Sequence, residues 1–280
     1  MTLLATELLD IDGKKLRVAR SGPRDREAVV LLHGYPENLQ VWSEVLPRLS
    51  VHYDVIALDW PGMGESETWR GGAAPQQQAE RLLCILDVLG VDRCHVVGAD
   101  MGGQPALVFG ATHGDRTRSI TVMNSLLFGD RETSWEIRLL REHGFNVRAL
   151  SWLPRAVFLR ARYTFLEHPQ RLSPEHAREF WRTFRRPEVR HFISRMCAGY
   201  QGSLPRLPSV YEHVRAPVHA LWGENDKHFP TAQAHALTRA LPDCRLTLIS
   251  GGQHWMMLER AEELVDAMTS FYSDVGRTNR

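Results

Sequence analysis

The chain of 280 residues is long enough to bury a sizeable hydrophobic core. Hydrophobic residues make up 43% of it and charged residues 24%, which is ordinary for a soluble globular protein. The net charge of +1 offers no electrostatic footprint to nucleic acid or to an anionic membrane, and no run approaches the roughly 20 apolar residues that span a bilayer. We therefore expect a soluble protein with a small-molecule partner, no nucleic acid and no membrane.

The four cysteines stand apart, without a CxxC pair or the His/Cys spacing of a zinc site: Cys84, Cys94, Cys197 and Cys244. Isolated cysteines are typical of a reducing cytoplasm, where they act as small buried hydrophobes. The N-terminus carries acids where a signal peptide needs a positive flank. We therefore expect an unprocessed cytoplasmic protein with no metal site and no cofactor.

The first part of the chain alternates strands with helices. Residues 5–11 and 14–20 predict a hairpin around the turn DIDGKK. The continuous apolar runs AVVLLHG (28–34) and YDVIALDW (53–60) predict strands that are buried on both faces of a parallel sheet. The other elements predicted here are a helix over 38–49, a helix that opens at Pro75 and ends at Gly90, a strand over 94–99, a helix over 101–113 and a strand over 119–124.

Residues 126–210 break this alternation. They hold no clear strand, are rich in Arg, Trp and Phe, and are interrupted by six prolines, so short helices fit best. The alternation resumes with a strand over 217–226, a helix over 231–241, a strand over 244–250 and a final helix to about Tyr272. This order predicts an α/β fold, in which residues 1–125 and 211–280 form a mostly parallel sheet with helices on both faces and 126–210 form an inserted helical lid.

Polar residues stand at four predicted strand ends, which is where ligands bind in an open parallel sheet. They are the stretch HGYPE (33–37), Asp100 in GADMGG, Asp226 in GENDKHF and His254 in SGGQHW. A lone carboxylate at a strand-to-helix turn, such as Asp100, is most often a helix N-cap. The chain order of acid, acid and histidine instead favours a catalytic triad in which Asp100 is the nucleophile. Asp226, rather than the nearby Glu224, is then the acid that accompanies His254.

Together these motifs resemble the α/β-hydrolase fold family over nearly the whole chain. Within that family they resemble the branch with an aspartate nucleophile, which contains epoxide hydrolases, haloalkane dehalogenases and haloacetate dehalogenases. GADMG is similar to the nucleophile elbow, HGYP to the oxyanion turn, DWPGMGES to the next strand-end loop and GGQHW to the histidine loop. The resemblance implies that the backbone N–H groups of Tyr35 and Met101 form the oxyanion hole and that Pro36 follows a cis peptide bond.

An aspartate in the elbow suits attack on saturated carbon. With an ordinary pKa of about 3.9 its carboxylate is ionised at neutral pH, so it needs no base to attack an epoxide or a carbon–halogen bond. The product is an alkyl ester of Asp100, which water activated by His254 would hydrolyse while Asp226 orients the imidazole. Some dehalogenases place this acid after the preceding strand, where the present chain has Asn124, which carries no charge.

The residues around the nucleophile separate the members of this branch. Haloalkane dehalogenases hold the halide with N–H groups at the positions of Tyr35 and Met101, whose side chains here have none, and haloacetate dehalogenases carry arginines that DMGGQ lacks. Epoxide hydrolases donate protons from two lid tyrosines, for which Tyr163 and Tyr200 are the candidates. Weaker candidates for the donor are Tyr211, His168 and Trp181.

We predict an epoxide hydrolase that converts an epoxide into a vicinal diol, as a monomer or a homodimer. The aromatic residues that could form walls for an apolar or aromatic substrate are Trp42, Trp60, Phe128, Trp152 and Trp181. Dehalogenation on the same triad is the first alternative. A non-hydrolytic biosynthetic enzyme or a catalytically idle binding protein on the same fold is the second.

Overall fold

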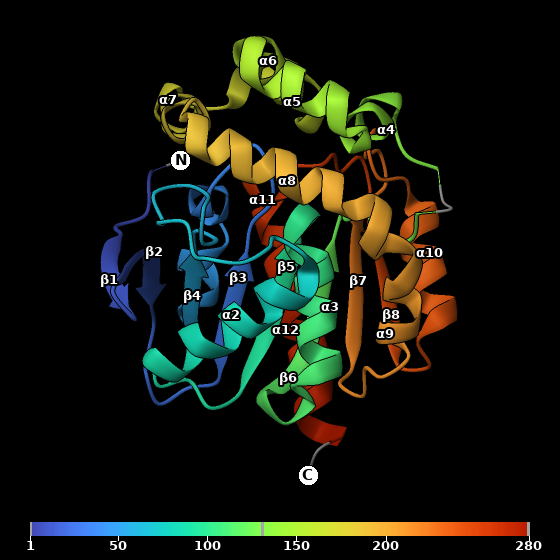
Figure 1. Cartoon of the computed structure of the whole chain (residues 1–280). Coiled ribbons are helices and arrows are strands. Elements are labelled where there is room, and N and C mark those ends of the chain that lie inside the picture. Colours follow the sequence, from blue (N-terminus) through green and yellow to red (C-terminus); the bar gives the residue numbers. More distant parts are fainter. Residues whose placement is uncertain (1, 130–131, 279–280) are drawn as a thin grey trace.

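The computed structural model describes residues 2–129 and 132–278 and arranges them around one eight-stranded sheet (Figure 1). The strands are β1 (Glu7–Ile11), β2 (Lys14–Ser21), β3 (Ala28–Leu32), β4 (Asp54–Leu58), β5 (Cys94–Ala99), β6 (Thr117–Met123), β7 (Val218–Gly223) and β8 (Cys244–Ile249). Their order is β1-β2-β4-β3-β5-β6-β7-β8, antiparallel between β1, β2 and β4 and parallel in the rest. The predicted mostly parallel sheet is therefore confirmed.

Local sequence explains these strands. The β1–β2 hairpin turns at Asp12 and Gly13, whose φ angles of 51° and 74° are the left-handed pair that a two-residue hairpin turn requires. Every residue of β3, β4 and β5 is buried, as expected of continuous apolar strands that have helices on both faces. Because the parallel strands share one direction, their carboxyl ends meet at one edge of the sheet.

Helices cover both faces of the sheet. The core helices are α1 (Leu46–Leu49), α2 (Pro75–Val88), α3 (Gly103–Thr112), α10 (Thr231–Ala240), α11 (Met256–Glu259) and α12 (Ala261–Thr278), with short 3-10 turns η1 (Leu39–Trp42), η2 (Asp100–Gly102) and η3 (Gly114–Arg116). Helices α2 and α3 pack together on one face, and α1 and α12 on the other (Figure 1). Within 2–129 and 132–278, none of the helices combines the length and the apolar character needed to cross a bilayer.

Two helices differ from the sequence-based expectation, and the strand expected over 217–226 ends earlier, at Gly223. Residues 38–49 do not form one helix: η1 is followed by a separate α1, because Pro47 lacks an N–H and fits only the first turn of a new helix. The last helix runs on to Thr278 instead of ending near Tyr272, since its buried positions continue to Val275.

Between β6 and β7 the described residues form helices and loops but no strand, and we name residues 126–210 the lid. Its elements are α4 (Trp135–Arg141), α5 (His143–Trp152), α6 (Pro154–Phe165), η4 (Pro169–Arg171), α7 (Pro174–Phe184), α8 (Pro187–Ser203), η5 (Leu204–Arg206) and α9 (Leu207–Tyr211). Figure 1 shows the long α8 between the sheet and the pair α5 and α6. We propose the expected division into a core, 1–125 with 211–280, and a lid, 126–210, as the domain organisation.

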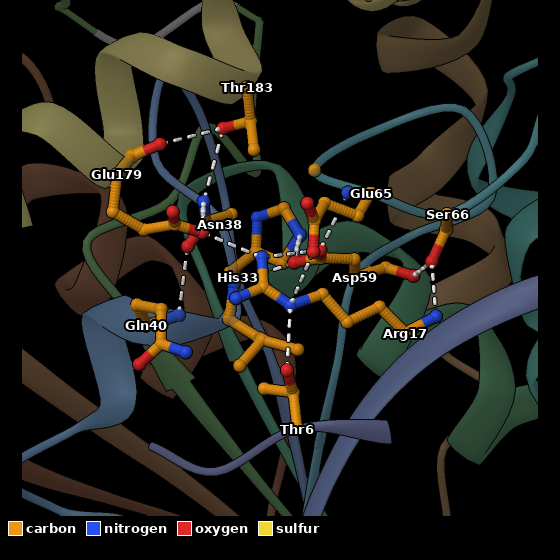
Figure 2. Close-up of polar contacts among 12 residues, drawn as sticks. Thr6, Arg17, His33, Asn38, Gln40, Asp59, Glu65, Ser66, Glu179 and Thr183 are labelled. Carbon is orange, nitrogen blue, oxygen red and sulfur yellow. Dashed lines mark hydrogen bonds and ion pairs between the residues drawn. The ribbon is translucent and has the colours of Figure 1, made fainter. Parts of the chain in front are cut away.

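A buried polar cluster ties α7 to the core (Figure 2). Arg17 Nη1 donates to Glu179 Oε1 at 2.8 Å and lies 3.5 Å from Asp59 Oδ2, and all three side chains are less than a tenth exposed. Asn38 Nδ2 also donates to Glu179 Oε1 and to Thr183 Oγ1. Because an unpaired buried charge is costly, this cluster holds α7 in one position relative to the sheet.

Candidate active site

Asp100 stands at a sharp turn between β5 and α3. Its φ of 50° lies in the left-handed region, which a non-glycine residue adopts only where its surroundings impose it. The turn requires small neighbours: a Cβ at Gly98 would lie 2.2 Å from the carbonyl oxygen of Gly102, and a Cβ at Gly102 would lie 2.5 Å from that of Leu32. The close approach of these backbones explains the small-x-acid-x-small pattern around Asp100.

The carboxylate of Asp100 contacts the oxyanion turn. Its Oδ2 accepts a hydrogen bond from the backbone N–H of Tyr35 at 2.8 Å, and the Tyr35–Pro36 peptide bond is cis, as the resemblance implied. Gly34 makes room for this contact, since a Cβ there would lie 2.3 Å from Asp100 Cβ. Met101 lines a small cavity that lies against Asp100, and its role as the second oxyanion donor stays a prediction.

Asp100, His254 and Asp226 come together at the carboxyl ends of β5, β8 and β7. His254 Nδ1 lies 2.8 Å from Asp226 Oδ2, and Nε2 lies 4.0 Å from Asp100 Oδ2. All three side chains are buried, and Asp226 Oδ1 accepts two backbone N–H groups of the loop that follows it. Glu224, the competing acid, is exposed. The geometry is that of a nucleophile, a base and an orienting acid.

Asn124 occupies the place where some dehalogenases carry the acid, and here it links the histidine loop to β7 by hydrogen bonds. Its Nδ2 donates to the carbonyl oxygens of Gln253 and His254 at 3.0 and 3.2 Å, and its Oδ1 accepts from the N–H of Gly223 at 2.8 Å. An amide offers donors and an acceptor together, which an ionised carboxylate does not. Asn124 thus holds the histidine loop against β7 and leaves Asp226 as the acid.

Three carboxylates surround His254 and set the charge of the site. Burial raises the pKa of Asp100 from an ordinary 3.8 to about 7, with His254 opposing and Glu37 adding to the rise. Burial would lower the pKa of His254, but the charge of Asp226 and its hydrogen bond, helped by Asp100 and Glu37, raise it to about 9. Just above neutral pH the site therefore pairs an ionised Asp100 with a protonated imidazole.

A cavity of about 20 Å³, room for about one water molecule, lies against Asp100. It is lined by Tyr35, Asp100, Met101, Leu126, Ile137, Leu140, Arg141, Cys197, Tyr200 and Phe229. A larger apolar groove of about 230 Å³, among α4, α5 and α6, shares three of these residues. Arg141 and Cys197 come from α4 and α8 and were not expected here, because no motif in the lid sequence marks them.

The lid brings Tyr200 to this cavity, but it does not bring Tyr163. Tyr200 lies on α8 and is buried, whereas Tyr163 on α6 is 72% exposed, so its expected role as a second donor is wrong. The reason is helical periodicity: Ala161 and Phe165, each two positions from Tyr163, face inward, which places Tyr163 on the opposite side of the helix. Tyr211 is fully buried but does not line the cavity.

None of the aromatic residues expected as pocket walls lines the cavity or the groove: Trp42, Trp60, Phe128, Trp152 and Trp181. The first two are completely buried in the core, where the ring N–H of Trp60 donates to the carbonyl oxygen of His33. Trp152 is 79% exposed, and Trp181 packs near Phe184. These expectations are wrong because aromatic character predicts burial or contact without saying which face of an element a residue occupies.

His228 connects the loop of the triad acid to the lid, and no motif indicated it. Its Nδ1 lies 2.8 Å from Ser134 Oγ and its Nε2 lies 2.8 Å from Thr164 Oγ1. Thr164 Oγ1 donates to the carbonyl oxygen of Arg160, so it accepts from Nε2, and Nδ1 is the acceptor. Burial lowers the pKa of His228 to about 4, which keeps the ring neutral.

A sequence model of the α/β hydrolase fold family matches residues 27–261. The chain therefore belongs to the α/β-hydrolase family, and it is a hydrolase. It is 24% identical over 288 residues to epoxide hydrolase 4 of Mus musculus, covering 95% of this chain and 78% of that protein. It is 26% identical over 263 residues to a 2-hydroxy-6-oxononadienedioate/2-hydroxy-6-oxononatrienedioate hydrolase of Burkholderia vietnamiensis, covering 90% and 89%.

Solved structures share the fold at low identity. An epoxide hydrolase without ligand superposes with a TM-score of 0.82 at 21% identity, covering 97% of this chain and 99% of that one. A haloalkane dehalogenase of Bradyrhizobium elkani has a TM-score of 0.82 at 18% identity, covering 98% and 99%. Since both reactions occur on this fold, the reaction of the present chain must be argued from its own site.

Proposed function

We propose that this α/β-hydrolase opens epoxides to vicinal diols through a covalent ester on Asp100. The observation that carries the proposal is the Asp100 carboxylate at the elbow, held by the Tyr35 N–H and sharing one cavity with the phenol of Tyr200. A serine nucleophile would need a base within hydrogen-bond distance, and His254 Nε2 lies 4.0 Å from Asp100 Oδ2. An ionised carboxylate attacks without such a contact.

In the first step, Oδ1 of Asp100 attacks an epoxide carbon, so that an ester C–O bond forms and the epoxide C–O bond breaks. Oδ2 stays on the N–H of Tyr35. The epoxide oxygen becomes an alkoxide on the substrate and takes the phenolic proton of Tyr200. Burial raises the pKa of Tyr200, so the phenol is protonated at neutral pH, while the charge of Arg141 favours the tyrosinate that forms.

In the second step, His254 takes a proton from water and the hydroxide adds to the ester carbon of Asp100. Oδ2 then carries the negative charge of the tetrahedral intermediate, which the Tyr35 N–H stabilises. The intermediate collapses by breaking the Cγ–Oδ1 bond. Oδ1 leaves with the substrate, takes the proton from His254 and becomes the second hydroxyl of the diol, while the oxygen of the water replaces it in the carboxyl group of Asp100. The diol leaves, and the new carboxylic acid of Asp100 returns its proton through solvent to the tyrosinate of Tyr200.

Formation of the ester prepares His254 to act as a base. The charge of Asp100 is one of the causes that raise the pKa of His254, and an ester carries no charge. The first step therefore lowers the pKa of the imidazole, which releases its proton to solvent and can then, in the neutral form, accept a proton from water. The imidazole takes a proton up again from solvent when the Asp100 carboxylate is restored. The nucleophile thus controls the protonation of its own base.

Dehalogenation is the second reaction that this triad could perform. Arg141 lines the cavity and is the observation that favours it, because a guanidinium can bind a departing halide. Tyr35 and Met101, from whose positions haloalkane dehalogenases donate, have no side-chain N–H. An idle binding protein or a non-hydrolytic enzyme would have no use for the complete triad and oxyanion turn, so we rank both below hydrolysis.

The test is mass spectrometry of a His254→Ala variant incubated with terminal alkyl and aryl epoxides. Because the base is removed, the ester should accumulate and add the mass of one substrate to the peptide that contains Asp100. Asp100→Asn is the matched control and should form neither adduct nor diol. Normal diol formation by this control would refute the proposal, and halide release from haloalkanes without any turnover of epoxides would replace it with dehalogenation.

A further inference from the structure

The charge of the chain is divided unevenly between the core and the lid. Residues 126–210 contain fifteen arginines, no lysine and eight acidic residues, a net charge of +7. The rest of the chain therefore carries −6, and the whole-chain value of +1 hides the difference. Our sequence-based exclusion of an anionic membrane rested on that whole-chain value, so it does not apply to the lid.

Exposed apolar side chains are concentrated on the same segment. Among the described residues eleven large apolar side chains are exposed, and seven of them lie within 135–163: Trp135, Phe145, Val147, Trp152, Leu153, Leu159 and Tyr163. We name these seven the outer lid surface. Figure 1 shows α5 and α6, which carry most of them, on the side of α8 away from the sheet. Such a concentration of exposed apolar side chains marks an interaction surface.

Unpaired arginines accompany the outer lid surface. Arg138, Arg148 and Arg155 are exposed and have no acidic partner within 2–129 and 132–278, whereas Arg160 pairs with Glu136 at 2.7 Å. Helices that combine exposed Trp, Phe and Leu with free arginines are typical of proteins that lie in the membrane interface. The charge and the apolar surface therefore point to the same kind of partner.

We propose that the outer lid surface docks on an anionic phospholipid bilayer. The apolar side chains enter the boundary between headgroups and acyl chains, and Arg138, Arg148 and Arg155 contact the anionic headgroups. A second copy of the chain fits less well, because pairing this surface with itself would bring two sets of unpaired arginines together. The bilayer supplies the complementary charge that a second copy lacks.

The apolar groove connects this surface to the active site. The groove is lined by Trp135, Phe145 and Leu153 of the outer lid surface and by three residues that also line the catalytic cavity. An apolar substrate dissolved in the bilayer could therefore reach Asp100 without crossing bulk water. That route rests on the proposed function, whereas the docking itself does not.

The experiment is sedimentation of the full chain with vesicles of phosphatidylcholine, with and without phosphatidylglycerol. The chain should partition onto the anionic vesicles, and added salt should weaken the binding. The double variant W152S/L153S should lower the partition coefficient at least tenfold, because two exposed side chains no longer enter the bilayer. R148Q/R155Q should lower it roughly thirtyfold on anionic vesicles, about fivefold for each arginine.

Matched controls are V51S and L248S, which remove exposed apolar side chains from the core and should bind like the unchanged protein. Emission from Trp152 should shift to the blue on anionic vesicles, and W152F should lose that part of the shift while still binding. Failure of the unchanged protein to bind either vesicle would overturn the proposal. So would equal losses in the control variants, or a dimer in analytical ultracentrifugation that W152S/L153S dissociates while vesicles leave it unbound.

Discussion

Replacing Asp100 with asparagine should abolish turnover and stabilise the fold. At pH 8 the buried carboxylate is ionised although its surroundings disfavour the charge, since burial and the Glu37 carboxylate raise its pKa to about 7. Asparagine has nearly the same shape and no charge, and its Oδ1 can still accept the N–H of Tyr35. The variant therefore removes the cost of the buried charge and keeps the geometry of the elbow.

The size of the effect follows from the pKa of Asp100. The rise of the Asp100 pKa from 3.8 to about 7 corresponds to a free-energy cost of about 4 kcal/mol for ionising Asp100 in the folded chain. The free energy of unfolding falls by this amount as the pH rises from about 4 to about 7, because Asp100 in the folded chain keeps a proton that the unfolded chain has already released. This cost is already net of the charge-assisted hydrogen bond from Tyr35, which favours the ionised form. We therefore expect the variant to be more stable by about 4 kcal/mol at pH 8 and to differ little at pH 4.

Urea titrations of both proteins at pH 8 and pH 4 measure this difference. The matched control is Asp92→Asn, which removes the charge of an exposed carboxylate and should unfold like the unchanged protein at both pH values. Equal stability of Asp100→Asn and the unchanged protein at pH 8 would refute the reasoning. A stabilisation of the same size at both pH values would refute it as well, because it could not come from ionisation.

Three further predictions concern the site and the lid. Gly34→Ala should slow epoxide hydrolysis at least a hundredfold in steady-state assays, because its Cβ would lie 2.3 Å from Asp100 Cβ and displace the nucleophile; an unchanged rate would contradict this. Glu179→Ala should lower the free energy of unfolding, measured in urea, by about 3 kcal/mol, because it removes the shortest ion pair of the buried Arg17. A loss below about 1 kcal/mol would contradict this prediction. The kcat/KM for epoxides should fall below about pH 7, where Asp100 takes up a proton, whereas a profile that is flat down to pH 5 would exclude this titration.

The core and the triad could be predicted because their signals are local. Strands buried on both faces appear in the sequence as continuous apolar runs, and Asp100 directly follows one of them, β5. Asp226 and His254 lie in the loops that follow β7 and β8. Parallel strands bring those ends to one edge whatever their separation along the chain. Asp100, Asp226 and His254 therefore meet in the structure although no local feature links one to another.

The lid could not be predicted at the same level because its contacts depend on how whole helices pack. Tyr163 and Tyr200 are both candidates for the proton donor from the sequence, yet Tyr163 is 72% exposed and Tyr200 is buried in the wall of the cavity next to Asp100. Arg141 reaches the cavity from a helix whose sequence shows no motif. The uneven charge between lid and core was visible in the sequence, but it required counting the segment separately from the whole chain.

Glu37 shows how geometry and electrostatics compete at such a site. One of its oxygens accepts from the N–H of Gly34 at 2.9 Å and the other from the ring N–H of Trp255, 218 positions away, at 3.0 Å. Only a carboxylate offers two acceptor oxygens, so an amide could not hold both the oxyanion turn and the histidine loop. The same charge raises the pKa of Asp100 and so opposes ionisation of the nucleophile. The site can keep this carboxylate because Asp100 still ionises near neutral pH, where the imidazole of His254 carries the compensating charge.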